Sequence, residues 1–505
     1  MSVRDRETRT AALRCDVVVI GSGIAGLSAA LAAAEAGADV VVVERAERGS
    51  HGGNTRYTEA FLRMRSLSDV SEDFVEALSD QAGHHIDPDL AAETLLDERT
   101  WSPLARTLNF ANPTLIARFA EEAGPTLEWL ATQGLRFEPT PTPFITTSTT
   151  RLAPVGGGLE LIETLTRQAE LRSVRFEFGV TGESLIRDST GGVVGLRARR
   201  AGGDVVDVAA TAVVLACGGF QGNPEMMARY VERASLVRPI ARGGYYNRGE
   251  GIQMALDAGA AAGGNYSLFH AEPIDPRSGI AEPAVFIFPY GVLVDLDGRR
   301  FVDEAPGKVD ATYEAITRRI LERPRGIAYV ILDAGIEDVP NYQVALRTDQ
   351  PPIRGDSLPQ LGRTLGIPAD TFARTMADYN AACPDPAGFV PLELDGLATA
   401  GVEPPKSNWA RPVDRSPFLA YPITCANVFS FGGVVITTSG QVVHRDGWAI
   451  PGLYAAGEVI GLYHDVYVGS TSVLRGAVFG RLAGQHAGAT CTGARPAGTR
   501  TPAPP

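Results

Sequence analysis

Three glycines and an acidic residue near the start of the chain have the types and spacing to bind a dinucleotide. Gly21, Gly23 and Gly26 form a G-x-G-x-x-G directly after the β-branched run 15–20, and Glu44 ends the next apolar run. The first glycine permits a tight turn, the second lets backbone amides approach a pyrophosphate, and the third lets a helix pack against the sheet. Glu44 lies about twenty residues further on, where a carboxylate can accept hydrogen bonds from a ribose diol. This arrangement predicts a dinucleotide-binding site.

The elements that must position these residues can be read from the same segment. Residues 15–20 (CDVVVI) predict a buried parallel strand, and residues 27–37 predict an Ala-rich helix that ends at Gly37. A second strand is expected at residues 39–43. The helix would direct the partial positive charge of its N-terminus at the phosphates. The segment therefore predicts a Rossmann-type α/β unit.

Two further segments favour FAD over NAD. Gly-Gly-Asn-Thr at residues 52–55 could run backbone amides along the diphosphate and the flavin ring. Far along the chain, Gly457 and Glu458 follow a short strand, and residues 469–472 open a helix. The N-terminus of that helix could stabilise the negative charge that a reduced flavin accumulates near N1 and the C2 carbonyl. The residues expected to contact FAD are Gly21, Gly23, Ile24, Ala25, Gly26, Glu44, Arg45, Gly52, Gly53, Asn54, Thr55, Gly157, Gly158, Val180, Ala216, Gly218, Gly457, Glu458, Ser472 and Val473.

Together with residues 215–220 (LACGGF), the two ends of the chain resemble the fumarate reductase/succinate dehydrogenase flavoprotein superfamily. That superfamily also includes 3-ketosteroid dehydrogenases, urocanate reductases and tricarballylate-type dehydrogenases. The resemblance implies an α/β fold with a split Rossmann-type FAD-binding domain and an inserted α+β capping domain that closes over the substrate. We expect a disordered N-terminus at 1–13, the FAD-binding domain at 14–270 and 429–490, the cap at 271–428, and a disordered tail at 491–505.

The resemblance also implies how FAD is held. His51 directly precedes Gly-Gly-Asn-Thr, as in the soluble members that bind FAD without a covalent bond. The membrane-bound relatives, which attach FAD through a His near this position, continue with a different motif. Non-covalent FAD is therefore expected.

Four residues are candidates for catalysis. His270 stands at the family spacing for the His before the cap, and Lys308 falls where the family has its proton-donating Arg. Tyr467 resembles the Tyr that polarises the substrate ketone in the ketosteroid branch. His464 is the fourth candidate, because the chain has only seven histidines and this one lies in the final flavin loop.

Other family groups that bind dicarboxylates are missing. The cap Glu falls near Ala284, the His of the return strand falls on Val428, and no Arg precedes Gly469 in the final loop. Their loss argues against fumarate or succinate as the substrate and favours a less charged ligand. Arg475, about one turn into the last helix, is interpreted as a tether of that helix.

Composition limits the partners. The 505-residue chain carries a formal net charge of −13, which argues against nucleic-acid binding. The N-terminal residues lack the apolar run of a signal peptide, and no apolar stretch is long enough to span a membrane. Five scattered cysteines without a CxxC pair fit a reducing cytoplasm. No metal site is expected.

These observations predict an FAD-dependent oxidoreductase that moves hydride between flavin N5 and a CH–CH or C=C bond beside a carbonyl or carboxyl group. The substrate would be a small molecule, and electrons would pass to or from a separate, unidentified partner. One alternative is a flavoprotein oxidase or tailoring enzyme of secondary metabolism that uses oxygen as acceptor. Another is a non-catalytic FAD-binding protein. The sequence leaves the oligomeric state open.

Overall fold

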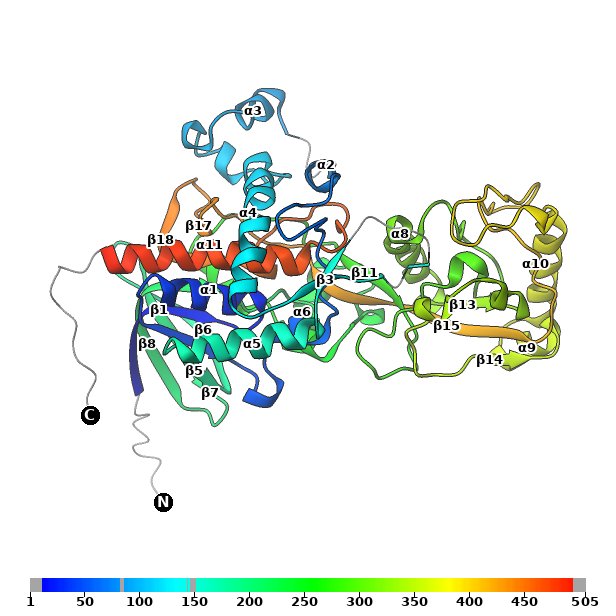
Figure 1. Ribbon diagram of the computed structural model, residues 1–505, viewed down its shortest axis with the longest axis horizontal. Coiled ribbons are helices and arrows are strands. Elements are labelled where there is room, and N and C mark those ends of the chain that lie inside the picture. The colour runs from blue at the N-terminus through cyan, green and yellow to red at the C-terminus, as the bar shows by residue number, and fades with distance from the viewer. Residues whose placement is uncertain (1–10, 82–85, 143, 146–150, 494–505) are drawn as a thin grey trace, which may run out of the picture.

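Two lobes make up the molecule, each built around its own sheet (Figure 1). The computed structural model describes residues 11–81, 86–142, 144–145 and 151–493. Residues 11–13 belong to strand β1 (Ala11–Ile20) and residues 491–493 to helix α11 (Ser472–Gly493), so the expected disorder was wrong for these six residues. Ala11, for example, pairs with Val206. The other residues of the two expected disordered ends lie outside the described ranges.

The larger lobe contains a mostly parallel sheet with the strand order β17-β18-β8-β1-β2-β5. Strand β1 lies between β2 and β8 and is parallel to both, with Val17 opposite Val40 and Ala212. The antiparallel pair β6 and β7 extends the sheet from β8. The strands are β2 (Val40–Glu44), β5 (Arg175–Phe178), β6 (Val180–Arg187), β7 (Val193–Arg200), β8 (Val205–Leu215), β17 (Gln441–Val443) and β18 (Ala449–Ala455).

Helices α1 (Ile24–Glu35) and α11 join the two ends of the chain across one face of this sheet (Figure 1). Four glycines, Gly476, Gly480, Gly484 and Gly488, recur every fourth residue along α11 and face α1. A Cβ on Gly484 would lie 2.8 Å from the backbone of Ala29, which is too close for any side chain. The glycine spacing therefore lets the C-terminal helix pack directly on the backbone of the first helix.

The remaining elements of the larger lobe surround this centre. They are helices α2 (Phe74–Ser79), α3 (Pro88–Glu93), α4 (Pro113–Thr132), α5 (Gly157–Leu171), α6 (Pro224–Tyr230) and α7 (Glu250–Asp257), and strands β3 (Phe137–Pro139), β4 (Leu152–Pro154), β10 (Ala262–Gly263) and β16 (Gly433–Val434). Within the described residues, no helix is both long and apolar enough to cross a membrane.

The smaller lobe is built on the antiparallel sheet β11-β15-β13-β12. Its strands are β11 (Phe269–Ile274), β12 (Val292–Asp295), β13 (Ile327–Leu332) and β15 (Phe418–Ser430), with β9 (Arg238–Pro239) and β14 (Ile353–Gly355) also pairing with β15. Its helices are α8 (Val309–Leu321), α9 (Leu358–Leu365) and α10 (Ala369–Ala382). The expected cap, 271–428, begins within β11 and ends within β15, so both predicted boundaries fall inside strands of this sheet.

Alternating apolar residues give this sheet two buried faces. On β12, Leu293 packs in the core that contains α8, whereas Val292 and Val294 pack in the core that contains α9 and α10. Side chains of successive strand residues point to opposite faces, so this alternation places helices on both sides. The cap is thus an α+β layer with α8 between its sheet and the larger lobe, where β11 and β15 connect the two lobes (Figure 1).

Candidate functional site

A cavity with about 1290 Å³ of empty space, partly open to solvent, lies at the junction of the two lobes. Its lining comes from both ends of the chain and from the cap, through residues such as Gly21, Ser472 and Glu282. Seventeen of the twenty residues expected to contact FAD line it: all of those named above except Gly26, Gly157 and Gly158.

The glycine loop between β1 and α1 forms one wall of the cavity. Gly21 has φ +101°, a conformation that favours glycine. Gly23 lines the cavity, whereas a Cβ on Gly26 would collide with the backbone carbonyl of Gly21. The third glycine therefore acts by allowing close packing of α1, and it does not contact the cavity.

Loop 52–55 closes the other side of the α1 N-terminus. The Thr55 hydroxyl accepts a hydrogen bond from the Ile24 N–H at 3.2 Å, and Asn54 Nδ2 donates to the Val428 carbonyl at 2.9 Å. Gly158 lies behind this loop, because a Cβ there would lie 2.8 Å from the Thr58 oxygen. Gly157 and Gly158 thus support the loop from the start of α5 and lie outside the lining of the cavity, and their direct contact with FAD stays a prediction.

Glu44 is held at the end of β2 as the ribose interpretation requires. Its Oε2 accepts hydrogen bonds from the Ser22 N–H at 2.9 Å and the Ser22 hydroxyl at 2.6 Å, and its Oε1 accepts from the Ala46 N–H at 2.8 Å. The same Ser22 hydroxyl lies 3.1 Å from His51 Nδ1. Burial lowers the pKa of His51, so this ring is neutral at pH 7.

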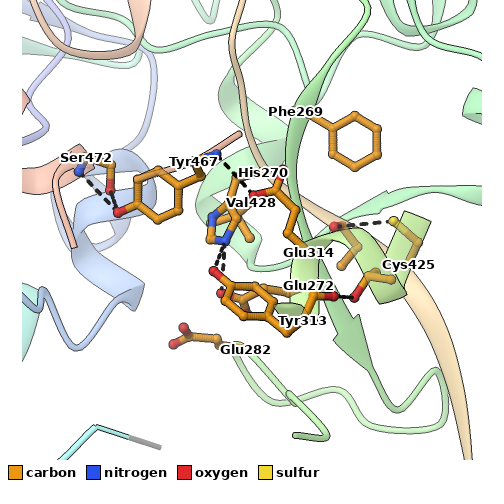
Figure 2. Close-up of polar contacts among 12 residues, drawn as sticks. Phe269, His270, Glu272, Glu282, Tyr313, Glu314, Cys425, Val428, Tyr467 and Ser472 are labelled. Carbon is orange, nitrogen blue, oxygen red and sulfur yellow. Dashed lines mark hydrogen bonds and ion pairs between the residues drawn. The ribbon is translucent and has the colours of Figure 1, made fainter. Parts of the chain in front are cut away.

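Tyr467 lies at the N-terminus of α11. Its hydroxyl oxygen accepts hydrogen bonds from the backbone N–H groups of Thr471 at 3.1 Å and Ser472 at 3.2 Å, and its O–H donates to the Ser472 side chain at 3.1 Å (Figure 2). Its ring lies 4.3 Å from the ring of His270. The helix N-terminus thus fixes a phenolic hydroxyl beside the cavity residues Ser472 and Val473.

His270 is paired with a residue that the sequence interpretation did not find. Its Nε2 lies 2.6 Å from the hydroxyl of Tyr313 on α8, and Figure 2 shows the ring between Tyr313 and Tyr467. Burial, with a smaller effect of Arg318, holds the pKa of His270 well below its usual value. Burial likewise raises the pKa of Tyr313. Both groups are therefore neutral at pH 7.

Two carboxyl groups complete the cap side of the junction. Glu282 lines the cavity, and Glu272 lies 3.7 Å from His270 Nε2. Burial raises the pKa of Glu282 to about 7, although Arg347 at 3.4 Å opposes this shift. Burial and the neighbouring Glu282 raise the pKa of Glu272. The cap Glu expected to be absent near Ala284 thus has a counterpart two residues earlier, in a turn where Glu282 adopts φ +53°.

None of the four catalytic candidates is among the residues that line the cavity, although Tyr467 bonds Ser472 and His270 packs on Phe429, and both of these partners do line it. Lys308 is exposed and precedes the first residue of α8, whereas Tyr313, five residues later, points inward. His464 is buried, and its backbone is fixed by Gln81 and Asn265, which bond its N–H and its carbonyl. Family spacing alone made Lys308 a catalytic candidate. Helix α8 begins directly after it, and the side chain that this helix brings to the junction is Tyr313.

Arg475 and Tyr313 are the main residues that the sequence interpretation missed. Arg475 is buried, lines the cavity and stacks on Tyr463 and Phe429, with its guanidinium carbon 4.7 and 5.4 Å from their ring centroids. It was interpreted as a tether, yet its Nε and Nη1 atoms have no hydrogen-bond partner among the described residues. The sequence did contain a signal for a role of Arg475 at the cofactor, because this arginine lies on the first turn of a helix whose N-terminus was expected beside the flavin.

The residues present fit FAD. A helix N-terminus and a glycine turn are available for the diphosphate, and the Glu44 carboxylate is available for a ribose. A polar ligand in the same region would also satisfy buried polar atoms that have no hydrogen-bond partner among the described residues. These atoms are Asn54 Oδ1, Gln221 Oε1 and Arg475 Nε. The flavin ring would lie between α11 and the cap.

Comparison with known proteins agrees with this geometry. The family model of the FAD binding domain matches residues 16–474. The chain belongs to this family. FAD is therefore its cofactor, and the chain is a member of the fumarate reductase/succinate dehydrogenase flavoprotein superfamily.

Relatives of this FAD-binding protein differ in length and in the reactions that their names describe. It is 28% identical to the NADH:acrylate oxidoreductase of Vibrio harveyi over 94% of the chain, but it spans only 50% of that protein. It is 25% identical to the vinyl phenol reductase of Lactiplantibacillus plantarum, covering 94% of the chain and 96% of the relative. The solved 3-ketosteroid-Δ4-(5α)-dehydrogenase of Rhodococcus jostii RHA1 is 26% identical, with a TM-score of 0.65, covering 96% of this chain and 99% of that one.

Proposed function

We propose that this protein is an FAD-dependent oxidoreductase that acts on a CH–CH or C=C bond beside the carbonyl group of an uncharged organic substrate. Bound FAD supplies a hydride donor or acceptor at N5. The observation that carries the proposal is the charge of the cavity. Among the described residues that line it, the cations are Arg45 and Arg475, and Arg45 is paired with Glu250.

A dicarboxylate needs at least two cationic anchors, because an unpaired buried carboxylate is costly. The cap contributes no lysine or arginine to the described lining of the cavity; it contributes Glu282, a carboxyl group. Val428 and Phe429 contribute apolar surface at the same end. A ketone or aldehyde conjugated to a C=C bond fits this lining better than a diacid.

Tyr467 is positioned to polarise the substrate carbonyl. Two backbone N–H groups hold its oxygen, and its proton, now donated to Ser472, can be donated to a carbonyl oxygen that replaces it. The pair Tyr313–His270 and the carboxyl group of Glu282 are positioned to hold the proton that moves at the neighbouring carbon. Phe429 packs against the rings of both His270 and Tyr467.

The two relatives that this chain matches over nearly their whole length support an uncharged substrate. One is named a vinyl phenol reductase, and the other was solved with 4-androstene-3,17-dione. Non-covalent attachment of FAD, a cytoplasmic location and a separate electron partner belong to the same proposal. Acid precipitation tests the attachment, because FAD that is not covalently bound stays in the supernatant.

The substrate class can be tested by anaerobic reoxidation. The enzyme is photoreduced and mixed with a neutral enone such as 4-androstene-3,17-dione, a vinyl phenol, acrylate or fumarate, while flavin absorbance is followed. We expect a neutral compound to react at least ~100-fold faster than fumarate, since each missing charge-assisted hydrogen bond costs about 1.5–3 kcal/mol. Fastest reaction with fumarate or acrylate would contradict the proposal. Rapid reaction with oxygen and none with any alkene would favour an oxidase.

A further inference from the structure

A buried arginine, Arg475, lines the cavity with two of its three guanidinium nitrogens unbonded within the described residues. The Nε and Nη1 atoms of Arg475 are inaccessible to solvent and have no hydrogen-bond partner among the described residues, and 1% of the residue is exposed. The stacking contacts with Tyr463 and Phe429 are the direct interactions of its guanidinium. Burying a charged guanidinium without acceptors costs several kcal/mol. A bound group with acceptor atoms would satisfy Arg475.

Glu458, the acid of the lining that interacts electrostatically with Arg475, is already hydrogen-bonded to other groups. Glu458 Oε1 accepts hydrogen bonds from the Ser430 N–H at 2.8 Å and the Ser430 hydroxyl at 3.1 Å. Its Oε2 accepts from Gln221 at 3.3 Å and Asn247 at 3.1 Å. These four bonds fill its acceptor sites, and it makes no ion pair with Arg475. The Nε–H and Nη1–H groups of Arg475 therefore remain available to donate hydrogen bonds to a ligand.

The position of Arg475 indicates which part of FAD it meets. The diphosphate end is defined by Gly21 and Gly23, and the ribose end by Glu44. Arg475 lies one turn inside α11, and its stacking partner Phe429 contacts the rings of His270 and Tyr467 at 5.3 and 5.0 Å. These rings adjoin the cap, where a substrate must approach the flavin ring. The acceptors that FAD carries there are the carbonyl oxygens and N1 of the pyrimidine part of the ring.

We propose that Arg475 binds the pyrimidine carbonyl edge of the flavin and raises its reduction potential. Two-electron reduction of FAD places negative charge at this edge. A guanidinium fixed there in a dry site favours the reduced cofactor over the oxidised one, and the N-terminus of α11 acts in the same direction. This role would make the protein a better oxidant of its donor. It rests on FAD binding alone and is independent of the substrate class proposed above.

The test is the midpoint potential of the purified holoenzyme, measured with a reference dye during slow enzymatic reduction, and its affinity for sulfite, which adds to electron-poor flavins. Arg475→Gln removes the charge, and Arg475→Lys keeps it. Arg481→Gln is the matched control, because Arg481 lies on the same helix, contacts Glu122 at 3.5 Å and Thr126 at 3.4 Å, and does not line the cavity.

We expect Arg475→Gln to shift the ratio of reduced to oxidised FAD 10- to 100-fold toward the oxidised form, which equals a fall of about 30–60 mV. Sulfite affinity should fall in parallel. Because Arg475→Lys keeps the charge, its potential should fall by less than half as much. Arg481→Gln should leave the potential unchanged. An unchanged potential in Arg475→Gln would overturn the proposal, and an unchanged potential with a raised KM would assign Arg475 to the substrate.

The stability of the apoprotein separates this role from a structural one. Because Arg475 has no acceptor without FAD, Arg475→Gln should unfold at a temperature no lower than that of the wild-type apoprotein. A large loss of apoprotein stability would mean that Arg475 tethers α11, which would overturn the proposal. If Arg475→Gln does not retain FAD, Arg475→Lys is the deciding variant, and a potential equal to wild type within about 10 mV would support the charge as the cause.

Discussion

The second and third tasks of the glycine motif can be separated by two substitutions three residues apart. Gly26→Ala places a Cβ 2.9 Å from the carbonyl carbon of Gly21 and closer still to its oxygen. Helix α1 would have to move away, but Gly480 and Gly484 of α11 hold its backbone from the other side. Overpacking of this kind in a core lowers the free energy of unfolding by about 1–3 kcal/mol. Because neither the Gly21 backbone nor the α11 backbone can move aside easily, we expect Gly26→Ala to lie at the upper end of this range.

Gly23→Ala should affect the cofactor and leave the apoprotein stable. A Cβ on Gly23 would meet its nearest neighbours, the Gly52 oxygen and the Thr55 hydroxyl, at 3.6 Å, an ordinary van der Waals distance. Its φ of −69° suits any residue. The added methyl would instead occupy the space through which the diphosphate approaches the α1 N-terminus. Loss of two charge-assisted hydrogen bonds at about 1.5–3 kcal/mol each would weaken FAD binding at least ~100-fold.

The assays are thermal unfolding of the apoproteins, followed by tryptophan fluorescence, and titration with FAD, followed by quenching of flavin fluorescence. Gly26→Ala apoprotein should melt below wild type, and Gly23→Ala apoprotein should melt close to it. Gly49→Ala is the control, since a Cβ there has no neighbour within 4 Å. The reasoning is refuted if Gly23→Ala binds FAD within about threefold of wild type, or if Gly26→Ala leaves apoprotein stability unchanged.

Four other outcomes are expected. Burial raises the folded-state pKa of Glu282 from its ordinary value of 4.5 to about 7, so its contribution to stability is full below pH 4.5 and is lost as pH rises through 7. Glu282→Gln should remove about 2 kcal/mol of that decline in unfolding measured from pH 5 to 8. Tyr467→Phe should lower the rate of reoxidation by a neutral enone about 100-fold while FAD stays bound, and an unchanged rate would remove Tyr467 from the site. Lys308→Ala should leave that rate within about twofold, because Lys308 is exposed and outside the lining; a larger loss would restore the role expected from family spacing. Glu304→Gln should destabilise the cap by about 3–5 kcal/mol in thermal or urea unfolding, because it leaves buried Arg300 without its bidentate partner.

Local sequence determined the cofactor end of the protein. Gly21, Gly23 and Glu44 lie within 24 residues of one another, and the strand, turn and helix that position them are also local. The β-branched run and the glycine spacing therefore suffice to predict the turn, the helix and the binding of a dinucleotide. The helix at residue 472 could be predicted in the same way, since its N-terminus is a property of a single segment.

Only the tertiary structure decided which side chains meet at the cap end of the cavity. Tyr313 reaches His270 across 43 residues because α8 packs on β11, and the exposed Lys308 precedes that helix. Glu282 enters the lining through a turn with positive φ, which no spacing rule predicts. Arg475 is a candidate ligand of the flavin because its Nε and Nη1 are buried without a hydrogen-bond partner among the described residues and the oxygens of Glu458 bond other groups. A motif specifies the geometry of its own turn or helix, whereas the partner of a buried charge depends on the packing of segments that are distant in the chain.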